Sequence, residues 1–235
     1  MQAHTSTRTR QWAVLAVFAL SLAACSSGNG SGNDSGHDSG NDSGNVSGNG
    51  SALDSQLEAL PVADLTDTEL AGLAQMREEE KLAHDVYVAL FAQWQVQVFD
   101  NISAAELTHA DAVKALLDRY GLDDPASGNA EGVFTSPDMQ TLYDSLVAQG
   151  SESLVAALTV GATVEDLDIA DLRSLSTDAP DIALVYANLE KGSRNHLRAF
   201  TKQLVKQGAD YTPAYITQAD YDAIIAGGME QGSAG

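Results

Sequence analysis

Four long stretches of this chain repeat apolar residues at the spacing of an amphipathic helix, and strand-like alternation is nearly absent. They span residues 66–94, 103–120, 151–175 and 178–207. Shorter helices are expected at 137–150 and 218–226, and a connection rich in Gly, Asp and Pro covers 122–136. The pattern predicts an all-α fold: a four-helix bundle with a long crossover between helices 2 and 3 and short extra helices.

Residues that satisfy free backbone N–H groups mark the expected helix starts. Thr66 and Glu69 have the spacing of a capping box, and Ser103 and Glu106 repeat it. We therefore expect the first long helix to begin near Thr66 and the second near Ser103.

The N-terminal residues have the pattern of a secretory signal. Arg8 and Arg10 precede an apolar run from Trp12 to Leu20, which is too short for a stable transmembrane helix. Leu22-Ala23-Ala24-Cys25 follows and resembles the lipobox of bacterial lipoproteins, in which the cysteine becomes the lipidated first residue. This predicts a lipoprotein signal peptide at 1–24 and a protein of the bacterial cell envelope, lipid-anchored to the membrane and facing outside the cytoplasm. The alternative is an ordinary signal peptide with a cysteine nearby by chance.

Residues 25–51 follow the signal and consist almost entirely of Ser, Gly, Asn and Asp after the cysteine. Such a stretch has no apolar surface to bury, so it cannot offset the entropy lost on ordering. We expect a lipidated cysteine and a disordered tether there. The helical domain is expected at 52–226 and a flexible tail at 227–235.

The chain is strongly acidic, with 33 acidic and 12 basic residues and a formal net charge of −21. This excess argues against nucleic acid as a partner, because phosphates are bound by Lys and Arg. Cys25 is the only cysteine, so neither an intramolecular disulfide nor a cysteine metal knuckle can form. Arg194, Arg198 and Lys202 on the last helix are expected to form a solvated face.

Each long helix carries a carboxylate or an imidazole on the stripe that should be apolar. These residues are Glu80 on the first helix, Glu106 and His109 on the second, Glu165 on the third and His196 on the fourth. Burying unpaired carboxylates costs several kcal/mol each, so a core with three of them requires a compensating cation. Carboxylates and imidazoles on facing helices suit iron, manganese or zinc.

Taken singly, each residue has an ordinary explanation. Glu106 is also the third helical residue of its expected capping box. A lone His109 or His196 would suit a hydrogen-bonded core histidine. Glu80 would join a solvated face if the helix register shifted by one residue. Their coincidence near the middle of all four helices favours a metal site.

Three segments, Arg77–Tyr87, Glu106–Val113 and Gly192–Phe200, resemble uncharacterised bacterial and archaeal ferritin-like proteins. That family is a domain of unknown function related to rubrerythrin, ferritin and other di-iron carboxylate proteins, and the resemblance covers roughly residues 65–207. It implies a di-metal site of iron, or of manganese, held by Glu80, Glu106, His109, Glu165 and His196. Tyr87 matches an aromatic residue seven positions after the first ligand and is a candidate neighbour of the ligands.

One position departs from the pattern of the wider superfamily. The fourth helix there has a glutamate three residues before its histidine, whereas this chain has Ser193, which would lie beside the ligands. Glu190, one turn earlier, or Asp168, one turn after Glu165, would fill the gap. If neither does, the second metal is weakly held or absent.

The resemblance implies an iron-binding oxidoreductase of the ferroxidase or peroxidase type, which oxidises Fe(II) or reduces peroxide or oxygen. The chain has no rubredoxin-like cysteine cluster, so turnover would need an external electron donor or Fe(II) itself as substrate. Two alternatives stay open: a non-catalytic metal-binding lipoprotein, and an interaction module with a degenerate site. A homodimer is compatible with each, and the sequence identifies no catalytic residue beyond the ligands.

Overall fold

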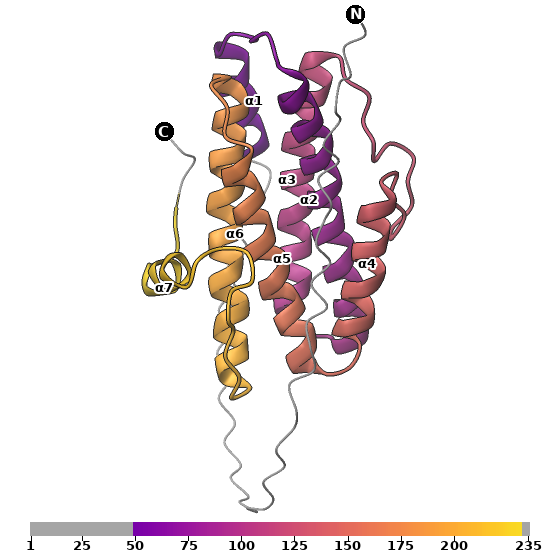
Figure 1. Ribbon diagram of the computed structural model, residues 1–235, viewed down its shortest axis with the longest axis vertical. Helices are drawn as coiled ribbons and strands as arrows, with labels where there is room; N and C mark the ends of the chain where they lie inside the picture. Colours follow the sequence, from indigo (N-terminus) through magenta and orange to yellow (C-terminus); the bar gives the residue numbers. More distant parts are fainter. Residues whose placement is uncertain (1–48, 232–235) are drawn as a thin grey trace, which may run out of the picture. The chain divides into compact units, whose positions relative to one another are not determined.

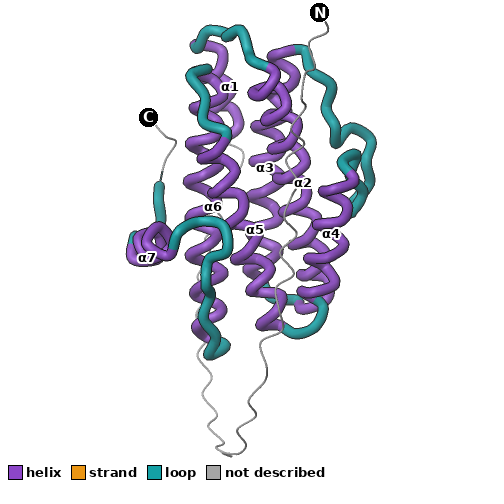
Figure 2. The backbone as a smooth tube through the Cα atoms, in the orientation of Figure 1, coloured by secondary structure: helices purple, strands orange, loops and turns teal. Residues whose placement is uncertain are grey.

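The computed structural model describes residues 49–231, which form seven helices and no strand (Figures 1 and 2). The helices are α1 (Asn49–Ala59), α2 (Asp67–Trp94), α3 (Gln97–Tyr120), α4 (Pro137–Gly150), α5 (Leu154–Ser174), α6 (Pro180–Lys206) and α7 (Gln218–Ala226). The predicted all-α fold is confirmed. Within this part of the chain, no helix is both long and apolar enough to cross a membrane. The predicted signal peptide, Cys25 and most of the predicted tether lie outside the described residues.

The four longest helices, α2, α3, α5 and α6, form the body of a helical bundle (Figure 1). α2 packs along α3 and α5 packs along α6, and the two pairs meet where α2 contacts α5 and α3 contacts α6. α4 lies against both α2 and α5, so it covers that side of the bundle. The largest side chains fully buried between the helices include Tyr87, Phe99, Phe200, Leu73, Met76, Leu116, Leu158 and Leu189.

The first long helix begins as predicted, because Thr66 and Glu69 form a capping box. The Thr66 hydroxyl accepts from the Glu69 N–H (3.3 Å), and the Glu69 carboxylate accepts from the Thr66 N–H (2.8 Å). These contacts satisfy two N–H groups that have no partner within the helix.

The prediction that the second long helix begins near Ser103 is wrong. α3 begins at Gln97, and only Gln95 and Val96 separate it from the end of α2. Gln95 adopts a left-handed backbone (φ 54°) that ends α2 and lets the chain reverse. Ser103 lies inside α3, where its hydroxyl donates to the carbonyl of Asp100 (2.9 Å). Glu106 is therefore no capping residue, which removes the ordinary explanation for its place on the inner face.

Two acidic residues of α2 hold the crossover between α3 and α4. Glu78 accepts the backbone N–H groups of Thr135 (2.7 Å) and Ser136 (3.0 Å) at the start of α4. Asp85 accepts the N–H of Gly132 (2.8 Å). Carboxylates at a helix N-terminus are stabilising because the free N–H groups point toward them. The crossover and α4 are thus fastened to the helix that also carries Glu80.

The segment between α6 and α7 is anchored by Asp166 of α5, which is fully buried. Its carboxylate accepts from the Tyr211 hydroxyl (2.8 Å) and from the backbone N–H groups of Ala214 (2.6 Å), Tyr215 (3.0 Å) and Ile216 (2.8 Å). Since Asp166 follows Glu165 directly, this contact also fixes the rotation of α5 where Glu165 faces the core.

Residues after α7 run back to α6. Glu230 accepts from Arg194 Nε (2.8 Å) and Arg198 Nη2 (3.0 Å), and its N–H donates to the Asn195 side chain (2.9 Å). The expectation of a solvated face is therefore corrected for Arg194 and Arg198, which lie against this segment. Of the predicted tail at 227–235, residue Glu230 is held in place, and 232–235 lie outside the described residues.

Candidate metal centre

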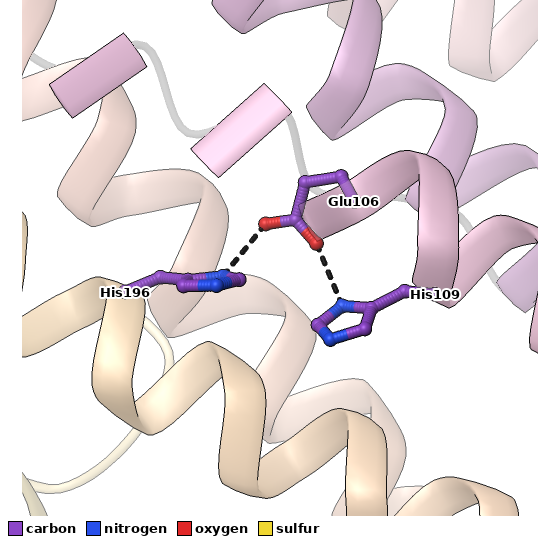
Figure 3. A group of neighbouring side chains, drawn as sticks. All are labelled: Glu106, His109 and His196. Atoms are coloured by element: carbon purple, nitrogen blue, oxygen red, sulfur yellow. Dashed lines mark ion pairs between the residues drawn. The ribbon is translucent and has the colours of Figure 1, made fainter. Parts of the chain in front are cut away.

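The middle of the bundle brings together one carboxylate and two imidazoles. Glu106 and His109 are three residues apart on α3, so both side chains lie on the same face of that helix. His196 reaches the same point from α6. One potential ligand atom from each of the three residues lies within 4.8 Å of the others. Figure 3 shows the Glu106 carboxylate between the two rings.

Glu106 divides its two oxygens between the two histidines. Oε2 lies 2.7 Å from Nδ1 of His109, and Oε1 lies 2.8 Å from Nδ1 of His196 (Figure 3). The two rings are stacked at an interplanar angle of 27°, with their centroids 5.5 Å apart. The carboxylate therefore bridges two separate nitrogen donors.

A second carboxylate accompanies each histidine. Glu80 Oε2 of α2 lies 3.4 Å from Nδ1 of His109, and Glu165 Oε2 of α5 lies 3.5 Å from Nδ1 of His196. Two sets of three donors result, each with one imidazole and one carboxylate of its own, and both share Glu106. The structure thus brings together the five residues that the resemblance implied as ligands.

Several polar atoms of this cluster are buried without a hydrogen-bond partner. They are Oε1 of Glu80, Oε1 of Glu106, and Nδ1 of both His109 and His196. The nitrogens are close to the carboxylate oxygens, yet no hydrogen bond of acceptable geometry joins them. Buried polar atoms almost always have partners, so converging lone pairs of this kind fit a bound cation.

Burial and neighbouring charges shift the ionisation of the cluster. Burial raises the pKa of Glu80 to about 7 and that of Glu165 to about 8, in the second case with help from Glu106. Burial opposes a charge on His196, but Glu106 and Glu165 outweigh it and raise its pKa to about 10. Burial also opposes ionisation of Glu106, yet the positive charges of His196 and His109 hold its pKa below the usual value. The metal-free cluster therefore holds protons that a cation would displace.

Tyr87 of α2 fixes the position of Glu165. It is fully buried, and its hydroxyl donates to Oε1 of Glu165. Its ring packs against Phe200 at a centroid distance of 5.1 Å. Phe200 also packs closely against α5, because a Cβ atom on Gly161 would stand 2.4 Å from its Cε1. Burial raises the pKa of Tyr87 well above its usual value, so it remains a hydrogen-bond donor.

A small cavity lies beside the cluster between α2, α4 and α5. Its acidic lining is Glu79, Glu80, Glu106, Glu165 and Asp168, and the rest comes from apolar side chains that include Leu142 of α4. The side of the centre nearest α4 therefore combines carboxylates with apolar side chains.

Comparison with known proteins identifies the domain that holds this centre. A sequence model described as an uncharacterized protein domain, DUF2202, matches residues 69–228, well over half of the chain. The chain belongs to the DUF2202 family. The matched residues include all four bundle helices apart from the first two residues of α2, and therefore the whole cluster around Glu106.

One relative extends this comparison. The uncharacterized protein MJ0754 of Methanocaldococcus jannaschii is 49% identical over 178 residues, which are 75% of this chain and 96% of the relative. The crystal structure of the hypothetical protein MJ0754 from Methanococcus jannaschii matches with a TM-score of 0.72 and 50% identity. The match covers 73% of this chain and 99% of that one. A solved structure thus shares the fold of this DUF2202 chain at high identity.

The structure separates Glu190 and Asp168, the two residues expected from the resemblance to replace a carboxylate at position 193. Glu190 forms ion pairs with Arg173 (2.9 Å) and Arg194 (2.8 Å), so its carboxylate is engaged away from the centre. Asp168 lines the central cavity and accepts a hydrogen bond from the Ser193 hydroxyl. Burial, and after it the charge of Glu80, raises the pKa of Asp168 well above its usual value.

Sequence reasoning missed Glu79, which is only 7% exposed and lines the same cavity. Its Oε1 accepts from the Gln75 side chain (2.9 Å), and burial followed by the charge of Asp171 raises its pKa well above the usual value. A signal was present in the sequence, because residues 72, 76, 79 and 83 form a second helical stripe beside that of Glu80. α2 is wedged between α3, α4 and α5, so it buries both stripes.

Proposed function

We propose that this DUF2202 domain is a ferritin-like bundle that binds two transition-metal ions around Glu106. The observation that carries the proposal is the division of the Glu106 carboxylate between His109 and His196. Each histidine also faces its own outer carboxylate, Glu80 or Glu165. The five donors thus supply two adjacent positions that share one bridging group.

The donor chemistry favours iron, and manganese after it. Mixed imidazole and carboxylate sets suit first-row transition metals, whereas Mg²⁺ and Ca²⁺ are bound mainly by oxygen. Cys25, the only cysteine, lies outside the described residues, so the cluster contains no thiolate that would favour Cu(I) or a structural zinc site. A divalent pair also offsets the charge of three buried carboxylates, which would otherwise be costly to bury.

Residues of the chain would prepare the site for redox chemistry. Tyr87 holds Glu165 in place through its hydroxyl, and the aromatic side chains beside it exclude water from that side. The raised pKa values of Glu80 and Glu165 favour their protonated forms in the metal-free state. A bound cation would displace these protons, which then become available to other acceptors. Bound Fe(II) would supply the electrons: reduction of one hydrogen peroxide to two water molecules would take one electron from each of two Fe(II), giving two Fe(III), and would consume two protons. This supports an oxidoreductase of the ferroxidase or peroxidase type that draws on Fe(II) or an external donor.

Metal stoichiometry tests the proposal directly. Full-length protein is loaded anaerobically with Fe(II), freed of excess metal and analysed for iron per chain. The wild type is expected to hold about two ions, and Glu106→Gln is expected to lose most of them because the bridge is no longer an anion. Glu131→Gln, which changes an exposed glutamate, is the matched control and should equal the wild type. Wild-type protein that binds no metal would overturn the proposal.

A second function, metal binding without catalysis, is favoured by Ser193, where a superfamily enzyme would have a carboxylate. It is separated from the first by oxygen and peroxide consumption in metal-loaded protein with excess reductant. Repeated turnover supports the oxidoreductase, whereas retention of metal with a single turnover or none supports a carrier. If the wild type binds no metal, the remaining alternative is an interaction module.

The location at the cell envelope is part of the proposal and rests on Leu22-Ala23-Ala24-Cys25. Cys25→Ala is expected to move the protein from the membrane fraction to the soluble fraction of bacteria that express it. Recovery of this variant in membranes would contradict lipid anchoring, but would not bear on the proposed metal centre.

A further inference from the structure

The two histidine-bearing helices are not equivalent. On α3, Glu106 precedes His109 by three residues, and on α6 Ser193 precedes His196 by the same interval. Both helices turn the first residue of the pair into the bundle interior, where Glu106 is 2% and Ser193 1% exposed. The pair on α6 therefore presents a hydroxyl at the position where the pair on α3 presents a carboxylate.

A carboxylate from the neighbouring helix lies at this position. Asp168 is one turn after Glu165 on α5, so both side chains lie on the same face of that helix. The Ser193 hydroxyl donates to Oδ2 of Asp168, and it also lies 2.9 Å from the carbonyl oxygen of Leu189. The serine hydroxyl therefore links Asp168 to α6.

The other oxygen of Asp168 has no protein partner. Oδ1 is buried and accepts no hydrogen bond, although Asp168 lines the cavity together with Glu80, Glu106 and Glu165. A buried carboxylate oxygen without a donor is costly, so an acceptor held in this way points to a bound group. Ser193 engages one oxygen and leaves the other free to bind a cation.

The charge of the centre also favours a fourth carboxylate ligand. Three carboxylates, those of Glu80, Glu106 and Glu165, leave one positive charge when two divalent ions are bound with neutral imidazoles. A fourth carboxylate makes the assembly neutral, and a neutral assembly costs less to bury than a charged one.

We propose that Asp168 is the sixth metal ligand of this centre, supplied by α5 in place of the carboxylate that α6 lacks and oriented by Ser193. The inference rests on the two-metal function proposed above. Asp168 contacts the metal directly, whereas Ser193 is a positioning residue that acts through Asp168.

Anaerobic titration with Co(II), followed by visible absorption and by equilibrium dialysis, tests this in the full-length protein. Wild-type protein is expected to take up two ions. Asp168→Asn should keep the first and bind the second at least tenfold more weakly, and the retained first ion shows that the variant is folded. Ser193→Ala should weaken the second ion about tenfold, the effect typical of a residue that orients a ligand.

A transplanted ligand keeps the test decisive if a single variant fails to fold. Ser193→Glu combined with Asp168→Ala returns the carboxylate to α6 and is expected to restore two ions with affinity near that of the wild type. Two ions bound by Asp168→Asn with wild-type affinity would overturn the assignment and leave the two-metal centre intact. Wild-type protein that binds no Co(II) or Fe(II) would instead overturn the proposed function itself, and the assignment with it.

Discussion

The imidazole of His109 lies so close to Gly192 that a Cβ atom at position 192 would stand 2.4 Å from its Cε1 and 2.5 Å from its Nε2. Real Cβ contacts essentially never fall below 3.0 Å. α6 therefore fixes the ring of His109 from behind and keeps Nδ1 directed at Glu106.

Gly192→Ala is expected to push the His109 ring out of place. Overpacking of this kind costs about 1–3 kcal/mol of stability, and we expect metal affinity to fall at least tenfold because Nδ1 moves away from Glu106. Metal titration and chemical unfolding measure the two effects. Gly228→Ala is the control, since nothing lies within 4 Å of a Cβ there. Equal metal affinity in Gly192→Ala and the control would show that metal binding does not depend on the position of the His109 ring.

Tyr87→Phe removes one hydroxyl and keeps the ring that packs against Phe200. Glu165 loses its hydrogen bond, so the variant should bind metal about 10–100-fold more weakly. The free energy of unfolding of the metal-free protein should fall by about 1–3 kcal/mol, the cost of an unsatisfied buried group. Tyr143→Phe, in a tyrosine away from the centre, should change neither quantity. A Tyr87→Phe variant with unaltered metal affinity would rule out a positioning role.

The pH dependence of stability should reverse sign when metal binds. Glu80 and Glu165 have pKa values raised from 4.5 to about 7 and about 8, and that of His196 is raised from 6.5 to about 10. At a pH between the ordinary and the raised pKa of each group, the folded metal-free protein holds more protons than the unfolded chain. Its stability therefore falls as pH rises from about 6 to about 9. Glu79 and Asp168 shift in the same direction.

The metal-loaded protein should become more stable over the same range, because a cation binds these groups only after they lose their protons. Thermal unfolding of both forms at the two ends of the range measures the difference. Parallel trends in the two forms would argue against a metal at this cluster.

Asp166→Asn tests the anchor between α5 and the segment that precedes α7. The amide keeps one acceptor oxygen but places an NH₂ group against backbone N–H donors, so we expect a loss of about 2–4 kcal/mol in the free energy of unfolding. Asp210→Asn, at an exposed aspartate in the adjoining loop, is the control and should change stability by less than about 0.5 kcal/mol. Equal unfolding curves for the two variants would contradict the assigned role.

Much of the fold could be predicted because its signals are local. The apolar stripes, the capping box at Thr66 and the prolines at positions 137 and 180 place most helix boundaries close to where the structure has them. The start of α3 was misplaced because Val96 provides no side-chain cap, while Ser103 and Glu106 imitate a capping box inside the helix. The N-terminal helix α1 was not predicted, and its first three residues, Asn49 to Ser51, were assigned to the tether because they continue a stretch rich in Ser, Gly and Asn.

The inward side chains of the centre were predictable for the same reason, as helical spacing alone turns Glu80, Glu106, His109, Glu165 and His196 inward. What the spacing could not show is which groups meet across helices. The engagement of Glu190 by Arg173, and the contact of Ser193 with Asp168, depend on the packing of α5 against α6. The spacing also could not show that Glu230, which follows α7, contacts Arg194 and Arg198 of α6.

Anomalous diffraction from crystals of the iron- or manganese-loaded protein, measured at the absorption edge of the metal, tests the central claim most directly. The account predicts two peaks on either side of the Glu106 carboxylate, one beside His109 and Glu80 and the other beside His196 and Glu165. No peak within this cluster, in crystals whose solution contains the metal, would contradict it.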